Sequence, residues 1–249
     1  MKENHFGADV APGYDERSEH MFNPAVLGPT VDFLAALAGD GRALELAIGT
    51  GRVGLPLSQR GTQVHGIEMS EAMVAQLREK PGSDKIAVAI GDMATTRVPE
   101  TFKLVYLVYN TITNLLAQDE QVECFRNAAA HLEPGGCFVV EVFVPELQRL
   151  PPGETARPFH VGGRHLGFDT FDLVNQQLIS HHYWVSGDKV DTFHSPHRFV
   201  WPSELDLMAR LAGMRLRERW SDWMRSSFTA DSRSHISVWQ KPADDDVTP

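Results

Sequence analysis

Short apolar runs alternate with amphipathic stretches along the first 144 residues of the chain. Apolar runs that suit buried strands stand at 43–47, 63–68, 86–90, 102–109 and 137–144. Between them, helical spacing of apolar residues predicts helices at 28–39, 52–61, 71–78 and 118–132. Strands that are apolar throughout and separated by helices indicate a doubly wound α/β fold, with a mostly parallel sheet covered on both faces.

Prolines, glycines and one serine set the expected ends of these helices. Pro29 stands early in the first helix and Gly39 stops it. Pro56 is tolerated only in the first turn of its helix, and Ser70 is placed to cap the next one. The segment Glu-Pro-Gly-Gly at 133–136 is expected to end the fourth helix before the fifth strand begins.

From Pro145 to Trp201 the pattern changes to one rich in aromatic residues and histidines. The pairs Gly162-Gly163 and Gly187-Asp188 predict tight turns within this segment. We therefore expect 145–201 to form an antiparallel β cap inserted after the fifth strand, and the ligand to bind at the carboxyl ends of the parallel strands.

The last part of the chain returns to a core pattern. A helix is predicted over 202–213, with Leu205, Met208 and Leu211 turned inward and Gly213 just past its end. Strands predicted at 215–220 and 235–240 complete a seven-stranded sheet. The expected organisation is a core formed by 1–144 and 202–241, the cap at 145–201, and a flexible tail at 242–249.

Composition and charge narrow the class of partner. The chain has 249 residues, 42% hydrophobic, and a formal net charge of −10, which suits a globular protein and not a basic, phosphate-tracking surface. We therefore expect no nucleic-acid partner. The start of the chain has no apolar signal-like stretch, and no apolar run approaches the ~18 residues of a membrane span. A cytoplasmic location is expected.

Cysteine and histidine spacing gives no indication of a metal site. Cys124 and Cys137 fall in different predicted elements, and we expect both to be reduced and buried. No helical His-x-x-x-His pair or neighbouring cysteine pair accompanies the histidines of the cap. No metal is expected.

The stretch Leu-Glu-Leu-Ala-Ile-Gly-Thr-Gly-Arg-Val-Gly, residues 44–54, runs from the first strand into a glycine-rich loop. Gly49, Gly51 and Gly54 match the dinucleotide fingerprint G-x-G-x-x-G. Glu45, however, stands four residues before the first glycine. A carboxylate there would repel a pyrophosphate but favour a ligand that carries a sulfonium and an ammonium, such as S-adenosylmethionine (SAM).

In this order of acid and glycines the chain resembles the class I SAM-dependent methyltransferases. The resemblance implies that the loop wraps the methionine and ribose of SAM, through Glu45, Ala47, Gly49, Thr50 and Gly51. Two alternatives stay open at this point. An NAD-dependent oxidoreductase would take the glycines literally, with Glu68 at the ribose. A SAM-binding protein without catalytic activity is the other.

Acids and amides after the next three strands strengthen the resemblance. It implies that Glu68 binds both ribose hydroxyls. Met69 would flank the adenine, and Asp92 and Met93 would contact its amine and ring. Tyr109 and Asn110 would line the sulfonium. Each polar residue has a plainer interpretation as a turn-former or strand-end residue.

The acceptor side is less defined by the sequence. Tyr14 belongs to an N-terminal segment of the kind that folds over the cofactor in small-molecule members of the family. Glu141 lies inside an apolar strand and needs a partner, either in the cleft or in a buried arginine. His181 and His182 point to opposite faces of a strand, so one of them is expected to face the cleft. Glu141, His181 and His182 are the candidate catalytic residues.

The predicted activity is therefore methyl transfer from SAM to a small-molecule acceptor, with S-adenosylhomocysteine (SAH) as product. By fold-level analogy the acceptor is a sugar or natural-product intermediate. The methylated atom is left open. The cap is expected to cover the cleft, to form a homodimer interface, or to do both.

Overall fold

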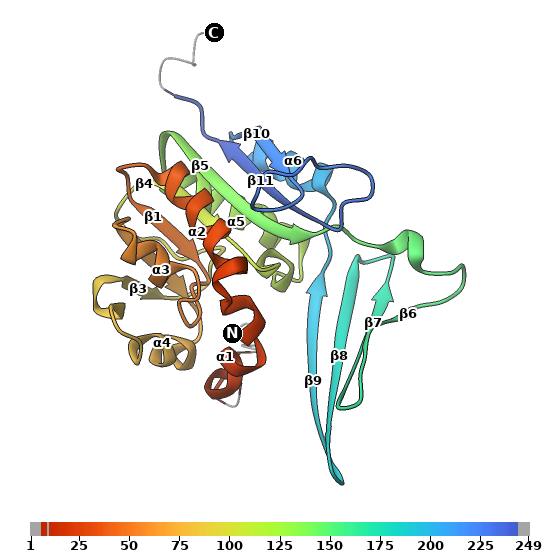
Figure 1. Cartoon of the computed structure of the whole chain (residues 1–249). Helices are drawn as coiled ribbons and strands as arrows, with labels where there is room; N and C mark the ends of the chain where they lie inside the picture. The colour runs from red at the N-terminus through yellow and green to blue at the C-terminus, as the bar shows by residue number, and fades with distance from the viewer. Residues whose placement is uncertain (1–5, 9, 244–249) are drawn as a thin grey trace.

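A seven-stranded sheet forms the centre of the molecule (Figure 1), in a computed structural model that describes residues 6–8 and 10–243. The predicted tail lies mostly outside the described residues. The strand order is β10-β11-β5-β4-β1-β2-β3, and every pairing is parallel except the two made by β11. The strands are β1 Ala43–Leu46, β2 Val64–Glu68, β3 Ala87–Ile90, β4 Phe102–Leu107, β5 Leu132–Phe143, β10 Arg215–Trp220 and β11 Ser234–Gln240. The predicted doubly wound, mostly parallel sheet is confirmed.

Helices cover both faces of this sheet, as the apolar strands require. One face carries α2 Pro24–Ala38, α3 Gly54–Gln59 and α4 Glu71–Arg78, and the other carries α5 Gln118–His131 and α6 Pro202–Leu211. A short α1, Tyr14–Arg17, precedes them. The 3₁₀ turns are η1 Ala11–Gly13, η2 Glu19–Phe22, η3 Ser83–Lys85, η4 Thr111–Asn114 and η5 Leu147–Arg149. No described helix is long and apolar enough to cross a membrane.

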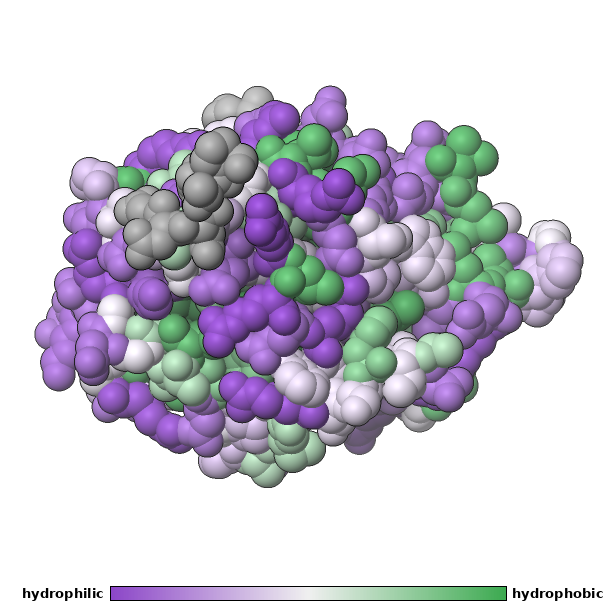
Figure 2. All heavy atoms as spheres, turned by 90° about the horizontal axis from the view of Figure 1, so that it is seen from above, coloured by the Kyte–Doolittle hydropathy of each residue, from purple (hydrophilic) through white to green (hydrophobic). Residues whose placement is uncertain are grey.

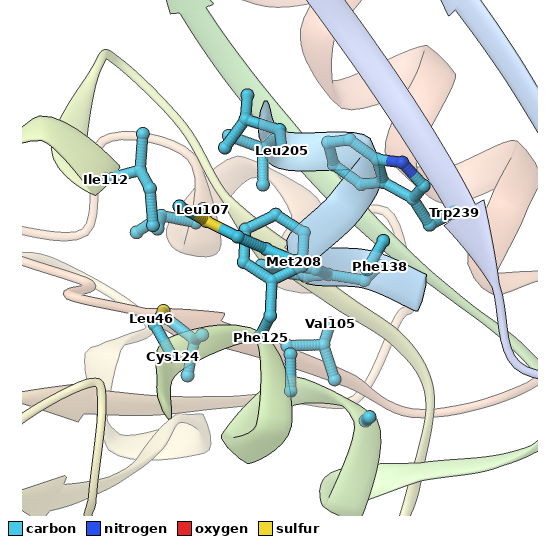
Figure 3. Packing of buried hydrophobic residues seen from close by; sticks show 14 of the residues in the cluster. Leu46, Val105, Leu107, Ile112, Cys124, Phe125, Phe138, Leu205, Met208 and Trp239 are labelled. Atoms are coloured by element: carbon cyan, nitrogen blue, oxygen red, sulfur yellow. The ribbon is translucent and has the colours of Figure 1, made fainter. Parts of the chain in front are cut away.

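Large aromatic side chains fill the core between the sheet and α5 and α6 (Figure 3). The Phe125 ring meets Phe138 and Trp239 edge to face, with centroids 5.0 and 5.1 Å away. Edge-to-face pairs of this kind add to the energy of burying the rings. Cys124 and Cys137 are both buried, as expected.

The structure differs from the prediction at two element boundaries and in the orientation of one side chain, besides smaller shifts at helix and strand ends. The helix α2 begins at Pro24 instead of Gly28, because the Asn23 side chain caps it by accepting from the Ala25 amide at 2.9 Å. The segment 133–136 lies inside β5, where the register with β4 slips between the Phe102 and Leu104 pairings. In α6, Leu205 and Met208 are buried, but Leu211 is 56% exposed, so its inward placement was wrong.

The insertion forms a separate antiparallel sheet in the order β6-β7-β8-β9. Its strands are β6 Ala156–Val161, β7 His165–Asp172, β8 Gln177–Ser186 and β9 Lys189–Arg198. The predicted glycine pairs stand in the turns between β6 and β7 and between β8 and β9. Figure 1 shows this sheet projecting away from the core on the side of the N-terminal helix α1.

The root of the insertion sheet is tied to the core by buried polar contacts. The Arg198 guanidinium donates to Gln121 Oε1 at 2.6 Å and to Glu204 Oε1 at 2.7 Å. His197 Nδ1 lies 2.9 Å from the hydroxyl of Thr113 in η4. These contacts fix the start of the sheet next to the segment that follows β4.

Candidate active site

The loops after β1 and β4 meet at the point where the strand order reverses. Adjacent strands whose chains leave in opposite directions form a crevice there, which is the usual ligand site of an open α/β sheet. The β1 loop holds Ala47, Gly49 and Gly51 at positive φ, and the β4 loop holds Tyr109 and Asn110. Left-handed backbone at non-glycine residues is unfavourable and concentrates at functional sites.

Glu68, at the end of β2, holds the glycine loop. Its carboxylate accepts from the Gly49 amide and from the Ser70 amide, each at 2.8 Å. Burial raises the pKa of Glu68, and these amides oppose the shift because they favour the charged form. Each carboxylate oxygen has a second lone pair, so the contacts leave acceptor capacity for a ligand.

Glu45 lies beneath the loop, as the sequence indicated. It is 3% exposed, and its Oε2 accepts from the Tyr106 hydroxyl at 3.0 Å. Burial raises the pKa of Glu45 to about 8, against the hydrogen bonds from Tyr106 and the backbone of Gly54. Burial therefore favours the neutral acid, whose repulsion of a pyrophosphate is weaker than that of a full charge.

The Tyr109–Asn110 turn faces the glycine loop. The guanidinium of Arg52 lies over the Tyr109 ring, 5.1 Å from its centroid, which is a cation–π contact. Glu141 Oε2 accepts from the Tyr109 amide at 2.8 Å. The Asn110 side chain accepts from the Phe143 amide at 2.8 Å. Both predicted residues are thus at the crevice, with their backbone held by β5.

The hydrogen-bond partners of the Glu141 carboxylate are a backbone amide and an indole, not an arginine. Besides the Tyr109 amide, its carboxylate accepts from the Trp223 indole at 2.8 Å. Trp223 belongs to the segment between β10 and β11. Through these contacts Glu141 holds the backbone of the β4 turn. Its catalytic role stays a prediction.

The N-terminal segment docks on the same loops. The Thr50 hydroxyl donates to Asp15 Oδ1 at 2.6 Å, and Lys80 pairs with the same carboxylate. Burial, and then the neighbouring Tyr109, raise the pKa of Tyr14 to about 12. Tyr14 is therefore close enough to the β4 turn to interact with it electrostatically, and its neighbour Asp15 contacts the glycine loop.

Three predicted residues follow β2 and β3. Asp92 Oδ1 accepts from the Ala94 amide at 2.7 Å, which is a turn-forming contact. Met69 and Met93 are half-buried, and Met93 packs against the core. The Gly91 amide donates to the Glu68 carbonyl at 2.9 Å, so these loops are adjacent.

The register assigns the cap histidines to faces. His182 pairs with Gly167 and Phe193, while His181 pairs with Phe168 and His194 on the opposite face. His197 shares the face of His182 and contacts η4. The Thr113 hydroxyl donates to the Asn110 carbonyl at 2.7 Å, so His197 donates from Nδ1. A neutral His197 then carries its lone pair on Nε2.

Comparison with known proteins decides the family. A methyltransferase domain model matches residues 43–136. The structure of the CcbJ methyltransferase from Streptomyces caelestis is 37% identical, covers 98% of this chain and 100% of its own, and superposes with a TM-score of 0.87. This chain belongs to the class I SAM-dependent methyltransferases. The cofactor of this methyltransferase is SAM, and the oxidoreductase and non-catalytic alternatives are set aside.

Two further relatives agree. The cypemycin N-terminal methyltransferase from a Streptomyces species is 25% identical over 92% of this chain and 97% of its own length. SAM-bound CalS10, an amino pentose methyltransferase from Micromonospora echinaspora, is 22% identical, covers 97% of this chain and 100% of its own, and has a TM-score of 0.70. At that identity the similarity to CalS10 supports only the fold of this chain.

Sequence reasoning missed several residues that the fold brings to this site. Asp15, Trp223 and His197 lie outside the glycine motif, whereas Arg52 lies inside it. Arg52 follows the second glycine of the loop, and its position there was the one available signal. The other three depend on tertiary contacts across 35, 82 and 84 residues of chain.

Proposed function

We propose that this methyltransferase transfers the methyl group of SAM to an amine nitrogen of a small-molecule acceptor, such as an amino sugar or another natural-product intermediate. The observation that carries the proposal is the crevice between β1 and β4, bounded by the glycine loop, the Tyr109–Asn110 turn and the docked N-terminal segment. Such a covered crevice fits a small acceptor.

The cofactor is assigned to this crevice residue by residue. Glu68 binds the ribose hydroxyls, since its carboxylate is fixed beside the loop and keeps free lone pairs. The loop from Ala47 to Gly51 takes the methionine end. Met69, Asp92 and Met93 take the adenine. Tyr14, Tyr109 and Asn110 then surround the sulfonium. Glu45 supports the loop from below.

A nitrogen acceptor is favoured over an oxygen acceptor by the hydrogen bonds that the carboxylates of the site already accept. Glu68, Glu141 and Asp15 already accept hydrogen bonds from protein groups. A neutral amine attacks the methyl carbon directly, the carbon–sulfur bond breaks to give SAH, and the new ammonium loses its proton afterwards. A hydroxyl needs a base during attack. A relative whose name gives an N-terminus as its target, the cypemycin N-terminal methyltransferase, supports nitrogen.

Acceptor contacts are expected from the face of the insertion sheet that carries His182 and His197. His197 joins this face to η4, next to Asn110, so the face is continuous with the β4 side of the crevice. Of the two histidines proposed from the sequence, His182 is therefore the one assigned to the acceptor side.

A paired-substrate assay tests the proposed acceptor class. Purified protein is incubated with methyl-labelled SAM and with amino sugars, each matched to the sugar that carries a hydroxyl at the same carbon. Methylation of amines, with the matched alcohols inert, is the expected result by mass spectrometry. Transfer to the alcohols, with the amines inert, would refute the nitrogen assignment.

The outward face of the insertion sheet is proposed as a homodimer interface. Its large exposed hydrophobic residues are Val161, Leu166, Ile179, Val185 and Val190, and the polar residues Thr192 and His194 are exposed on the same face. Hydrophobic residues gather at the right-hand end of Figure 2, the side on which this sheet stands in Figure 1. A large exposed apolar patch marks an interaction site more often than a solvated surface.

A further inference from the structure

The Tyr109–Asn110 turn is held from two directions by Glu141. The Tyr109 amide donates to Glu141 Oε2 at 2.8 Å, and the Asn110 amide donates to the Glu141 carbonyl at 3.1 Å. Both turn residues have positive φ, 58° and 61°. Two successive left-handed residues that are not glycine do not hold this shape on their own, so the surrounding contacts impose it.

Trp223 fixes the orientation of the Glu141 carboxylate. Its indole donates to Oε1 at 2.8 Å, while Oε2 serves the Tyr109 amide. The Trp223 ring packs edge to face on Phe33, a buried residue of α2, with centroids 5.4 Å apart. The segment between β10 and β11 thereby reaches the far end of the crevice, although no sequence motif connects the two.

Glu141 and Trp223 together form a clamp on the Tyr109–Asn110 turn. This clamp determines where the Tyr109 ring stands in the site. The ring lies against the Arg52 guanidinium of the glycine loop and close to Tyr14. A shift of the turn would therefore move the ring relative to the cofactor loop. Positioning of this kind is sensitive to displacements of an ångström.

We propose that Glu141 and Trp223 are positioning residues of the methyltransferase, which hold the Tyr109–Asn110 turn in the shape that completes the SAM site. The proposal rests on the proposed cofactor assignment of Tyr109 and Asn110. It replaces a catalytic role for Glu141 with an indirect one, because both carboxylate oxygens are engaged by protein donors.

Hydrogen-bond chemistry makes the clamp testable by a rescue. Both partners of the Glu141 side chain are N–H donors. In Glu141→Gln, one of the two meets the amide NH₂, which is also a donor. Adding Trp223→Phe removes one of the donors. The single Gln oxygen is then free to accept from the Tyr109 amide, while the NH₂ group turns toward the space of the lost indole nitrogen.

The experiment measures SAM and SAH affinity by calorimetry, with melting temperatures, for the wild type and the E141Q, W223F and E141Q/W223F variants. E141Q is expected to weaken SAM binding about tenfold or more, the cost of one mispaired, partly buried donor. The double variant is expected to recover most of that loss. Trp220→Phe is the matched control, since its indole donates to Glu218 and not to the clamp.

Three outcomes would overturn the proposal. They are unchanged SAM affinity in E141Q, a double variant that binds no better than E141Q, and recovery of the melting temperature without recovery of SAM affinity. The last would assign Glu141 to the fold alone. The test needs no acceptor, so failure of the amine assay leaves it intact. Wild-type protein that did not bind SAM would instead refute the cofactor assignment.

Discussion

Glu45 shows what burial does to a single residue at this site. Its folded pKa of about 8 lies above the ordinary value of 4.5, so the folded chain binds the proton more tightly than the unfolded chain. The stability that this proton contributes is complete below pH 4.5, and it is lost as the pH rises through about 8. The contribution of His235 to stability depends on pH in the opposite direction, because burial lowers its pKa to about 3.

We expect Glu45→Gln and the wild type to differ in how their stability depends on pH. Gln stays neutral, so the variant should lack the loss of stability that the wild type shows between pH 4.5 and about 8, a loss of at most several kcal/mol at ~1.4 kcal/mol per pKa unit. Denaturant unfolding at intervals of pH measures the difference. Because His235 is present in both proteins, its contribution cancels. Parallel curves would show that Glu45 titrates normally.

Glu68 carries the second prediction at this scale. Glu68→Gln keeps one oxygen and loses the charge, so SAM affinity should fall by roughly 10- to 100-fold, corresponding to ~1.4–2.8 kcal/mol for charge-assisted hydrogen bonds. Glu71→Gln, three residues along on the exposed side of α4, is the matched control. Calorimetry with SAM decides, and equal affinity in both variants would remove Glu68 from the ribose.

At the scale of elements, the N-terminal segment is joined to the glycine loop by few contacts. Asp15 bonds Thr50 and pairs with Lys80, and the pair is partly exposed, which limits its energy. Asp15→Ala should raise the SAM dissociation rate roughly threefold to tenfold, or ~0.7–1.4 kcal/mol. Stopped-flow measurements against the exposed neighbour Glu16→Ala test this. Equal rates in the two variants would show that the segment does not retain SAM.

Strands and helices followed from the apolar pattern where the pattern is strong. The five parallel strands and the Ser70 cap were predictable, since each depends on residues adjacent in the chain. The early start of α2 was not, because Asn23 stands outside the apolar pattern. The strand that absorbs 133–136 was also unforeseen, since its pairing with β4 overrides local turn signals.

The residues of the candidate site likewise divide into those that the sequence predicts and those that only the folded structure shows. Glu68, Gly49 and Tyr109 follow strand ends, and the parallel topology alone brings such ends to one edge. Glu141 was found as an anomaly, an acid in an apolar strand, but its partner Trp223 lies 82 residues away. No spacing rule connects them, so only the folded structure reveals what the acid does.

For the molecule as a whole, a net charge of −10 opposes the approach of two copies except through uncharged surface. The outward face of the insertion sheet provides one. Across the 156–161, 166–170, 179–185 and 190–196 stretches, the register places no Asp, Glu, Lys or Arg on it. Four strands of 6, 8, 10 and 10 residues, ~4.8 Å apart and rising ~3.3 Å per residue, give about 540 Å² of flat area. That approaches the ~800 Å² per partner of a stable interface.

The proposed homodimer should therefore be broken by one charge on this face. Wild-type protein is expected to show twice the 27.7 kDa chain mass in light scattering, and Ile179→Lys the mass of one chain, because the partner face offers the lysine no counter-charge. Leu207→Lys controls for any exposed leucine, since Leu207 is 54% exposed on α6, away from the sheet. Equal melting temperatures would show that both variants fold. A dimer that survives Ile179→Lys but not Leu207→Lys would move the interface to α6, and a monomeric wild type would leave the face to another partner.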